Sequence, residues 1–416
     1  MGNRWMGLAV AAALVIGSAG MARAQDSDPV AVGLMQGYPL AADKQVTLRN
    51  WLVFPFNRWA FRHVRELFPT GEVARTAETA SRLRRGEALA VDQIRFEAAD
   101  GKTVTAAEHF RREFIDGFIV LHRGRLVYEG LFSSMQASDR HLWQSMTKSF
   151  TGLLAEILIE QGKLDPARTA ADYVPDLRGT PWGAATLRHL LDMEVNVEEP
   201  STRAAELPPD FWSKAHFLDA LRDSGATQKG PNGTAWFYTN NAPQTVGLVM
   251  AKVTGQSWHG LARDLVWAPL RTEASGDIWL DTQGQAAAAG GFSSTLRDAA
   301  RFGQMMADGG KVGGRQVVPA AVIERLGASA GNAARTAAGN VLMLRQQPKM
   351  SYRSYWYQVN DGTRAIEGLG IFGQHLHVNP AERLVIVQFG SFTGPGPDPR
   401  NWTRLVEAIR AALRNR

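Results

Sequence analysis

Apolar residues form short runs bounded by turn residues in the first third and the last third of this 416-residue chain. Residues 118–122 and 126–129 flank a glycine-containing turn, which predicts a β-hairpin. Residues 374–378 and 384–389, joined across an Asn-Pro step, predict a second hairpin. Residues 402–413 have the period of an amphipathic helix. We therefore expect one sheet that combines strands from both ends of the chain.

The middle of the chain, from about residue 150 to residue 285, carries its apolar residues mainly at helical spacing. The first of these helical patterns stops at Gly162, a residue type that often ends a helix. Residues 242–253 predict another helix. The whole pattern indicates an α/β fold in which an antiparallel sheet is flanked by helices and joined to a mostly helical lobe. We expect the functional cleft between the two lobes.

The composition narrows the chemistry that the chain can support. The sequence contains no cysteine, which excludes disulfides, a thiol nucleophile and a thiolate metal site. Hydrophobic residues make up 45% of the chain, enough to bury a sizeable core in one large domain or two. The net charge of +6 reflects 46 basic against 40 acidic residues spread along the chain. That distribution favours a solvated basic surface over nucleic-acid binding.

Residues 1–24 have the organisation of a secretory signal peptide. A positive residue precedes a short apolar core at residues 8–16, and Ala22-Arg23-Ala24 matches a cleavage site. The alternative is an uncleaved membrane anchor, but the apolar run is too short to span a bilayer comfortably. We expect export, most simply to a bacterial periplasm, with no stable membrane anchor after cleavage. Residues 25–95 are expected to form an aromatic-rich extension packed on a core domain of residues 96–416.

The tetrapeptide Ser145-Met146-Thr147-Lys148 opens the predicted helix that ends near Gly162. Its spacing places the hydroxyl of Ser145 and the amine of Lys148 on one helical face. A serine hydroxyl becomes a good nucleophile when a base removes its proton, and a desolvated lysine can lose its own proton and act as that base. At the first turn of a helix, Ser145 would also lie where unpaired N–H groups favour negative charge. Taken alone, the tetrapeptide is also compatible with a chance match.

A second candidate motif, Tyr238-x-Asn240, precedes the predicted helix at residues 242–253. Its phenol can relay protons, and its amide can hold Lys148 or a substrate carbonyl. The structural alternative is a packed aromatic residue beside a helix-capping asparagine. The order and distance of this motif after the Ser-x-x-Lys tetrapeptide favour the catalytic interpretation.

These motifs resemble those of β-lactamase-related serine hydrolases, of which class C β-lactamases are the best-known branch. Within that group the sequence is most similar to 6-aminohexanoate-dimer hydrolases. The likeness is carried by residues 35–39, 58–67, 144–150, 186–193 and 290–298. The resemblance implies a serine hydrolase that forms an acyl-enzyme on Ser145 and needs neither a metal nor a cofactor. It also implies a small linear amide or ester as substrate, such as an aminohexanoate oligomer.

In the mechanism that this resemblance implies, Lys148 together with Tyr238 takes the proton of Ser145, and Tyr238 then protonates the leaving group. The backbone N–H groups of Ser145 and Ile371 hold the oxyanion. Alternatives inside the enzyme class are a carboxylesterase, a β-lactamase or a D-amino-acid peptidase. The alternative outside that class is a catalytically silent binding protein on the same fold.

One segment departs from the pattern of class C β-lactamases and penicillin-binding proteins, which carry Lys-Thr-Gly or a close variant on a strand beside the cleft. Residues 368–374, with the sequence Gly-Leu-Gly-Ile-Phe-Gly-Gln, occupy that place here. Gly370 and Gly373 would let the strand backbone approach a ligand closely, and with Asn240 they are the candidate substrate-binding residues. The missing strand lysine argues against penicillin-type substrates, unless an arginine that flanks the strand supplies the charge. The two such arginines are Arg353 and Arg364.

Other candidate groups also have an ordinary structural interpretation, which we favour for each. His375 and His377 would lie on one strand face, either as a metal pair without an apparent third ligand or as scattered histidines. A glutamate cluster either rims the cleft or belongs to a solvated loop, and comprises Glu194, Glu198 and Glu199. Four tryptophans either wall the cleft or belong to the core, namely Trp143, Trp182, Trp212 and Trp236.

Overall fold

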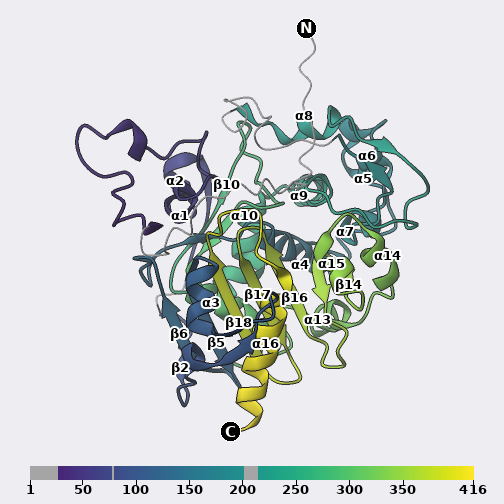
Figure 1. Cartoon of the computed structure of the whole chain (residues 1–416). Helices are drawn as coiled ribbons and strands as arrows, with labels where there is room; N and C mark the ends of the chain where they lie inside the picture. The colour runs from purple at the N-terminus through teal and green to yellow at the C-terminus, as the bar shows by residue number, and fades with distance from the viewer. Residues whose placement is uncertain (1–26, 77–78, 201–213) are drawn as a thin grey trace.

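An eight-stranded sheet forms the centre of the molecule (Figure 1). The computed structural model describes residues 27–76, 79–200 and 214–416, so the expected signal peptide lies outside the described residues. In spatial order the strands are β14 (Ser351–Arg353), β15 (Trp356–Gln358), β16 (Ile366–Gly370), β17 (Gln374–Asn379), β18 (Leu384–Gly390), β5 (Ile115–His122), β6 (Arg125–Leu131) and β2 (Arg84–Arg85).

Both hairpins expected from the sequence are present in this sheet. β5 pairs antiparallel with β6, and β17 pairs antiparallel with β18. β18 then pairs with β5, which sets Ile386 beside Val120 and makes the two hairpins neighbours. The prediction that strands from both ends of the chain share one sheet is therefore confirmed. The short strand β2 joins the edge of the sheet, parallel to β6.

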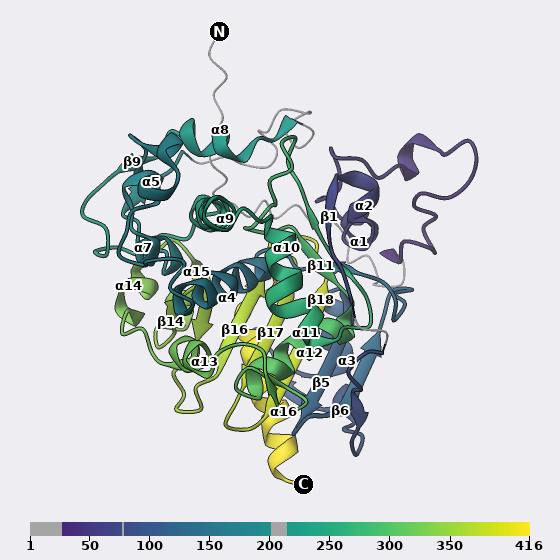
Figure 2. The ribbon, with the colours of Figure 1, turned by 180° about the vertical axis from the view of Figure 1, so that it is seen from behind.

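Helices cover both faces of the central sheet (Figures 1 and 2). α3 (Ala106–Arg112) and α16 (Pro399–Arg414) share an apolar core with one face of β5 and β18. α4 (Met146–Glu160) and α12 (Leu296–Ala307) pack against the other face. α16 contains the predicted amphipathic helix and begins after Asp398, whose carboxylate accepts a hydrogen bond from the Arg400 amide at 3.0 Å.

A mostly helical lobe extends beyond α4, as the sequence predicts (Figure 2). Its helices are α5 (Ala170–Tyr173), α6 (Pro181–Ala184), α7 (Leu187–Leu191), α8 (Phe217–Arg222), α9 (Asn241–Thr254), α10 (Trp258–Ala262) and α11 (Ala268–Leu270). The strand pair β8 (Val197–Glu198) and β9 (Thr227–Gln228) lies among them. In the described part of the chain, no helix combines the length and apolar character needed to cross a membrane.

A second sheet supports the start of α4. Its antiparallel strands are, in order, β1 (Thr70–Val73), β10 (Gly276–Trp279), β11 (Phe292–Ser294) and β7 (His141–Leu142). α1 (Phe56–Ala60) and α2 (Val64–Leu67) lie beside β1 and β10 (Figures 1 and 2). The expected extension thus contributes β1 and β2 to the two sheets, and its boundary at residue 95 stays a prediction.

Further short strands and α-helices are also present. They are the strand pairs β3 (Arg95–Glu97) with β4 (Thr103–Thr105) and β12 (Lys311–Val312) with β13 (Arg315–Gln316), and the helices α13 (Ala320–Gly327), α14 (Ala333–Ala338) and α15 (Leu342–Gln346).

Candidate active site

Ser145 stands at the N-terminus of α4, after a sharp change of chain direction that follows β7. Gln144, the preceding residue, has a φ of 48°, a left-handed conformation that residues other than glycine rarely adopt. Trp143 holds this turn, because its amide donates to the Phe292 carbonyl at 2.8 Å and its carbonyl accepts from the Met146 amide at 3.1 Å. The half-buried hydroxyl of Ser145 is therefore presented at the positive end of a helix dipole.

Lys148, one helical turn further on, is 1% exposed and has only neutral hydrogen-bond partners. Its Nζ lies 2.9 Å from Ser145 Oγ, 2.7 Å from Asn240 Oδ1 and 2.7 Å from the Ala289 carbonyl oxygen. Burial lowers the pKa of the Lys148 amine to about 7. A substantial fraction of Lys148 is therefore uncharged at neutral pH.

The three neighbours of Nζ suit an uncharged amine. A neutral amine has two N–H donors and one lone pair. Asn240 Oδ1 and the Ala289 carbonyl are both pure acceptors, so they take the two N–H groups. In the protonated form Nζ donates to Ser145 Oγ as well, and in the neutral form its lone pair is left facing the Ser145 hydroxyl. This arrangement is the one that a general base requires before it abstracts a proton.

Tyr238 lies over the same amine, with Lys148 Nζ 5.0 Å from the centroid of its ring. Burial raises the pKa of the Tyr238 phenol to about 12, so the group stays protonated at neutral pH. Its hydroxyl is hydrogen-bonded to Ser145 and to Tyr357 of β15. Burial also raises the pKa of the Tyr357 phenol, so both phenols of this pair stay protonated at neutral pH.

The side chain of Asn240, in the Tyr-x-Asn motif, binds Lys148 and does not cap a helix. Asn240 occupies the N-cap position of α9, yet its side chain makes no capping hydrogen bond and accepts from Lys148. The helix-capping alternative is therefore wrong. Asn340 fixes the loop from outside, because its side chain accepts from the Tyr238 amide at 2.7 Å and donates to the Tyr238 carbonyl at 2.9 Å.

Glu199 corrects the expectation that the glutamate cluster is a solvated loop. It is 8% exposed, and its Oε1 accepts from Thr239 Oγ1 at 2.7 Å and from Asn241 Nδ2 at 2.8 Å. These two donors flank Asn240, so Glu199 positions the loop that carries the amide. Glu198 is exposed and pairs with Lys229, as expected for a surface loop.

The backbone N–H groups of Ser145 and Ile371 make no hydrogen bond to another described residue. Ile371 begins the turn between β16 and β17, directly after Gly370. Phe372, the next residue, has a φ of 65°, and its amide donates to the Pro395 carbonyl at 2.8 Å. Two free amides from separate elements are the parts that an oxyanion hole needs.

The glycines of β16 approach the segment that carries Ser145. A Cβ atom on Gly370 would lie 2.5 Å from the Trp143 carbonyl oxygen, and one on Gly368 would lie 3.0 Å from Ser149 Oγ. Gly373 has a φ of 94°, which the turn into β17 requires. The backbone of β16 thus approaches the start of α4 closely. That Gly370 and Gly373 also contact the substrate stays a prediction.

Neither flanking arginine stands at the catalytic end of β16. Arg364 is exposed and precedes the strand, at the end opposite Gly370. Arg353 belongs to β14, which β15 separates from β16, and its charge acts on the buried carboxylate of Asp192.

The histidines and tryptophans have the structural roles that we favoured. His377 Nδ1 lies 2.8 Å from Glu367 Oε1, and His375 stacks on the ring of Trp402 at 4.3 Å. Over the described ranges, no group of three or more acidic or histidine side chains is arranged to hold a metal. The core includes Trp143, Trp182 and Trp236, whereas Trp212 lies outside the described residues.

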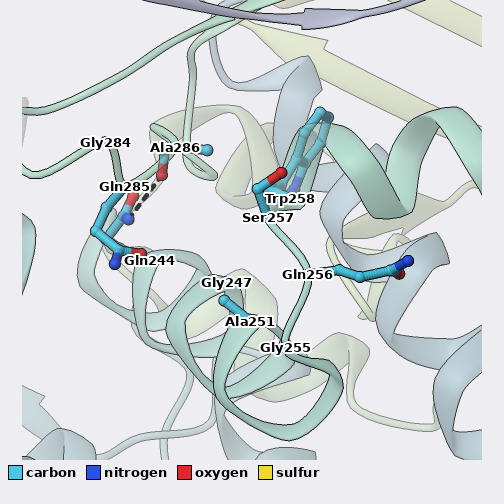
Figure 3. A pocket seen from close by; sticks show the side chains of 10 residues that line it. All are labelled: Gln244, Gly247, Ala251, Gly255, Gln256, Ser257, Trp258, Gly284, Gln285 and Ala286. Atoms are coloured by element: carbon cyan, nitrogen blue, oxygen red, sulfur yellow. Dashed lines mark hydrogen bonds between the residues drawn. The ribbon is translucent and has the colours of Figure 1, made fainter.

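A cavity of about 240 Å³ lies beside α9 (Figure 3). It is lined by residues of α9, of the α9–α10 connection and of the loop at residues 284–286. Gln244 lines it, and its side chain donates to the Ala286 carbonyl at 2.8 Å and accepts from the Ala288 amide at 3.1 Å. The serine, lysine and tyrosine of the site do not line this cavity.

An antiparallel sheet with a helical lobe, and a Ser-x-x-Lys at the start of the helix between them, define the fold class of serine β-lactamases and penicillin-binding proteins. The chain belongs to the β-lactamase family, whose pattern it matches over residues 112–410. It is a hydrolase of the β-lactamase fold.

Two relatives cover most of the chain. The sequence is 31% identical over 391 residues to the 6-aminohexanoate-dimer hydrolase of Paenarthrobacter ureafaciens, covering 89% of this chain and 94% of that protein. A solved structure from Bacillus anthracis, provisionally named 6-aminohexanoate-dimer hydrolase, is 26% identical with a TM-score of 0.81, covering 90% of this chain and 99% of that one. A penicillin-binding protein homologue from Caulobacter crescentus shares the fold, with 17% identity, a TM-score of 0.55 and coverage of 71% and 92%.

Proposed function

We propose that this protein is a serine hydrolase that cleaves small linear amides or esters through an acyl-enzyme on Ser145. The observation that carries the proposal is the 2.9 Å contact between Ser145 Oγ and a buried lysine amine whose other partners are neutral acceptors. A lysine held in this way can act as a base at neutral pH. The likeness to 6-aminohexanoate-dimer hydrolases supports a linear aminohexanoate amide as the named candidate substrate.

The first half of the reaction forms the acyl-enzyme. Ser145 Oγ attacks the substrate carbonyl carbon while its proton passes to the neutral Nζ of Lys148. The negative charge that develops on the carbonyl oxygen is held by the N–H groups of Ser145 and Ile371. Tyr238 gives its proton to the leaving amine or alkoxide as the bond to the carbonyl carbon breaks. The proton held by Lys148 then restores the phenol.

The second half releases the acid. A water molecule gives a proton to the neutral base as its oxygen attacks the acyl carbon. The ester bond to Ser145 Oγ then breaks, and the serine oxygen regains that proton. Tyr357 supports the first half, because its hydroxyl is hydrogen-bonded to Tyr238 and can donate to the phenolate that forms when Tyr238 gives up its proton. Sequence reasoning missed Tyr357, since β15 carries no motif that marks it.

Labelling with a fluorophosphonate, followed by intact and peptide mass measurement, tests the proposal. We expect one adduct per chain, located on Ser145, and none on the Ser145→Ala variant, whose kcat should fall about 10³-fold or more. Ser149→Ala is the matched control, because Ser149 lies one turn further along α4 and binds the Tyr355 carbonyl at 2.8 Å. A wild-type chain that stays unlabelled would favour a binding protein on this fold.

A further inference from the structure

The oxyanion turn at residues 371–373 packs against the N-terminal extension. Phe372 belongs to an apolar cluster whose other members come mainly from residues 34–68, and Ile371 packs against the same cluster. The ring of Phe61 lies 5.2 Å from the ring of Phe372. Because Phe372 holds a left-handed φ of 65°, its neighbours must stabilise a conformation that the residue does not favour by itself.

Phe61 also contacts the other half of the oxyanion hole. Its carbonyl oxygen accepts a hydrogen bond from the Leu142 amide at 2.8 Å. Leu142 ends β7, three residues before Ser145, and Trp143 between them is the residue that Gly370 approaches. Phe61 therefore contacts both segments that carry a free amide. Its ring packs on Phe372, next to Ile371, and its carbonyl oxygen binds Leu142, which lies close before Ser145.

A second route runs through the buried side chain of Asn57 on α1. Its Nδ2 donates to the Phe392 carbonyl at 3.1 Å and to the Ser391 carbonyl at 3.4 Å. The Phe392 amide in turn donates to the Phe372 carbonyl at 3.1 Å. This chain of hydrogen bonds reaches the backbone of the oxyanion turn, whereas Phe61 contacts the Phe372 side chain.

A buried ion pair anchors α1 next to both routes. Arg58 Nη2 lies 2.9 Å from Asp116 Oδ1, and both side chains are almost completely buried. The other carboxylate oxygen of Asp116 accepts from Ser391 Oγ and lies 3.3 Å from His141 Nε2. The pair therefore links α1 directly to β5, and Asp116 extends the link to β7 and to Ser391, which follows β18.

We propose that residues 57–61 are a positioning element of the oxyanion hole, in which Phe61 and Asn57 hold the Ile371 N–H in line with that of Ser145. This inference rests on the proposed function. The match to the β-lactamase family begins at residue 112, so the element lies outside the part that defines the family. The element adds no group that touches substrate; it fixes where two existing donors point.

Two buried phenylalanines of the extension provide a matched test. Phe61 packs on Phe372, whereas Phe68 stacks on Trp279 at 5.0 Å. With the full chain and p-nitrophenyl butyrate, Phe61→Leu should lower kcat by about 10- to 100-fold with little change in KM, because donors displaced by a fraction of an ångström hold the oxyanion poorly. Phe68→Leu removes an equal ring from the same cluster and should leave kcat within about twofold.

Phenylboronic acid gives a readout that a purely structural role would not move. Its tetrahedral adduct on a serine places an oxygen in the oxyanion hole, so its inhibition constant should rise in Phe61→Leu by the factor lost from kcat/KM. Its inhibition constant in Phe68→Leu should equal that of the wild type. Asn57→Ala supplies an independent variant, through the Phe392 route, if Phe61→Leu does not fold, and should lower kcat by about three- to tenfold.

The outcomes separate this inference from the proposed function. A wild-type chain that does not react with fluorophosphonate overturns both. A reactive wild type whose Phe61→Leu and Asn57→Ala variants keep kcat and boronate affinity overturns the inference alone. Equal losses in Phe61→Leu and Phe68→Leu, in step with their melting temperatures, also overturn it, because they indicate general destabilisation.

Discussion

At the scale of a single residue, the burial of Lys148 lowers the pKa of its amine and so suits it to act as a base. A charged amine in this place would need a carboxylate partner to offset its desolvation. Its partners are a hydroxyl, an amide oxygen and a backbone carbonyl, which offset only part of that cost. The lowered pKa of Lys148 is the physical result, and it is what makes the residue usable as a base.

The pH dependence of hydrolysis follows from that lowered pKa. The base must be unprotonated, so kcat/KM for p-nitrophenyl butyrate should rise with pH and level off above an apparent pKa of about 7. A profile measured between about pH 5 and about pH 9 checks this, and a flat profile would exclude Lys148 as the base. Lys148→Arg keeps a positive charge that cannot be lost, and should be about 10³-fold less active.

Tyr238 should matter most when the leaving group needs a proton. Because the pKa of Tyr238 is raised to about 12, we assign it the role of proton donor. Tyr238→Phe should reduce amide hydrolysis by about 10²- to 10⁴-fold, whereas p-nitrophenyl esters, whose leaving group departs unprotonated, should lose much less. Tyr357→Phe should also reduce amide hydrolysis more than p-nitrophenyl ester hydrolysis, but both losses should be smaller than in Tyr238→Phe. Equal losses on amides and p-nitrophenyl esters would contradict the assigned role.

Among the elements, β16 lies directly against the start of α4. Gly370→Ala would bring a Cβ atom to 2.5 Å from the Trp143 carbonyl oxygen, and backbone on both sides would have to move. We expect a loss of about 1–3 kcal/mol in the free energy of unfolding, together with a marked loss of kcat. Denaturant unfolding and ester hydrolysis measure the two effects.

Gly394→Ala is the matched control for that substitution. Nothing lies within 4 Å of a Cβ atom at Gly394, and the residue has no left-handed φ. The control should keep both the stability and the activity of the wild type. If Gly370→Ala behaves like Gly394→Ala, the close approach of β16 to α4 does not control the site.

The elements that the sequence revealed are those with a local pattern. The two hairpins, α9 and α16 each carry their own period and turn residues, and the Ser-x-x-Lys spacing sits inside one helix. Tyr357, Asn57 and the positioning role of Glu199 could not be found in this way. Each acts on the site through a partner far away in sequence, and no spacing along the chain encodes such a contact.

At the scale of the whole molecule, the preference between substrate classes depends on β16, which carries no lysine. The resemblance to class C β-lactamases and penicillin-binding proteins implies that Gly368 stands here in place of their strand lysine. A charge-assisted contact to a β-lactam carboxylate, worth about 1.5–3 kcal/mol, is therefore missing. We expect kcat/KM for p-nitrophenyl butyrate to exceed that for nitrocefin. A wide preference for nitrocefin would instead indicate a β-lactamase.

The pairing of β18 with β5 sets the order in which the protein is completed. Val387 of the last hairpin lies beside Ile119 of the first, so the sheet cannot close until the end of the chain is available. Pairing across such a separation is slow, because the loop entropy must be lost before the contacts form. A growing chain thus carries its serine and lysine long before the turn that supplies the second amide. Chains cut short before β16 should be inactive and prone to aggregate through the open edge of β5.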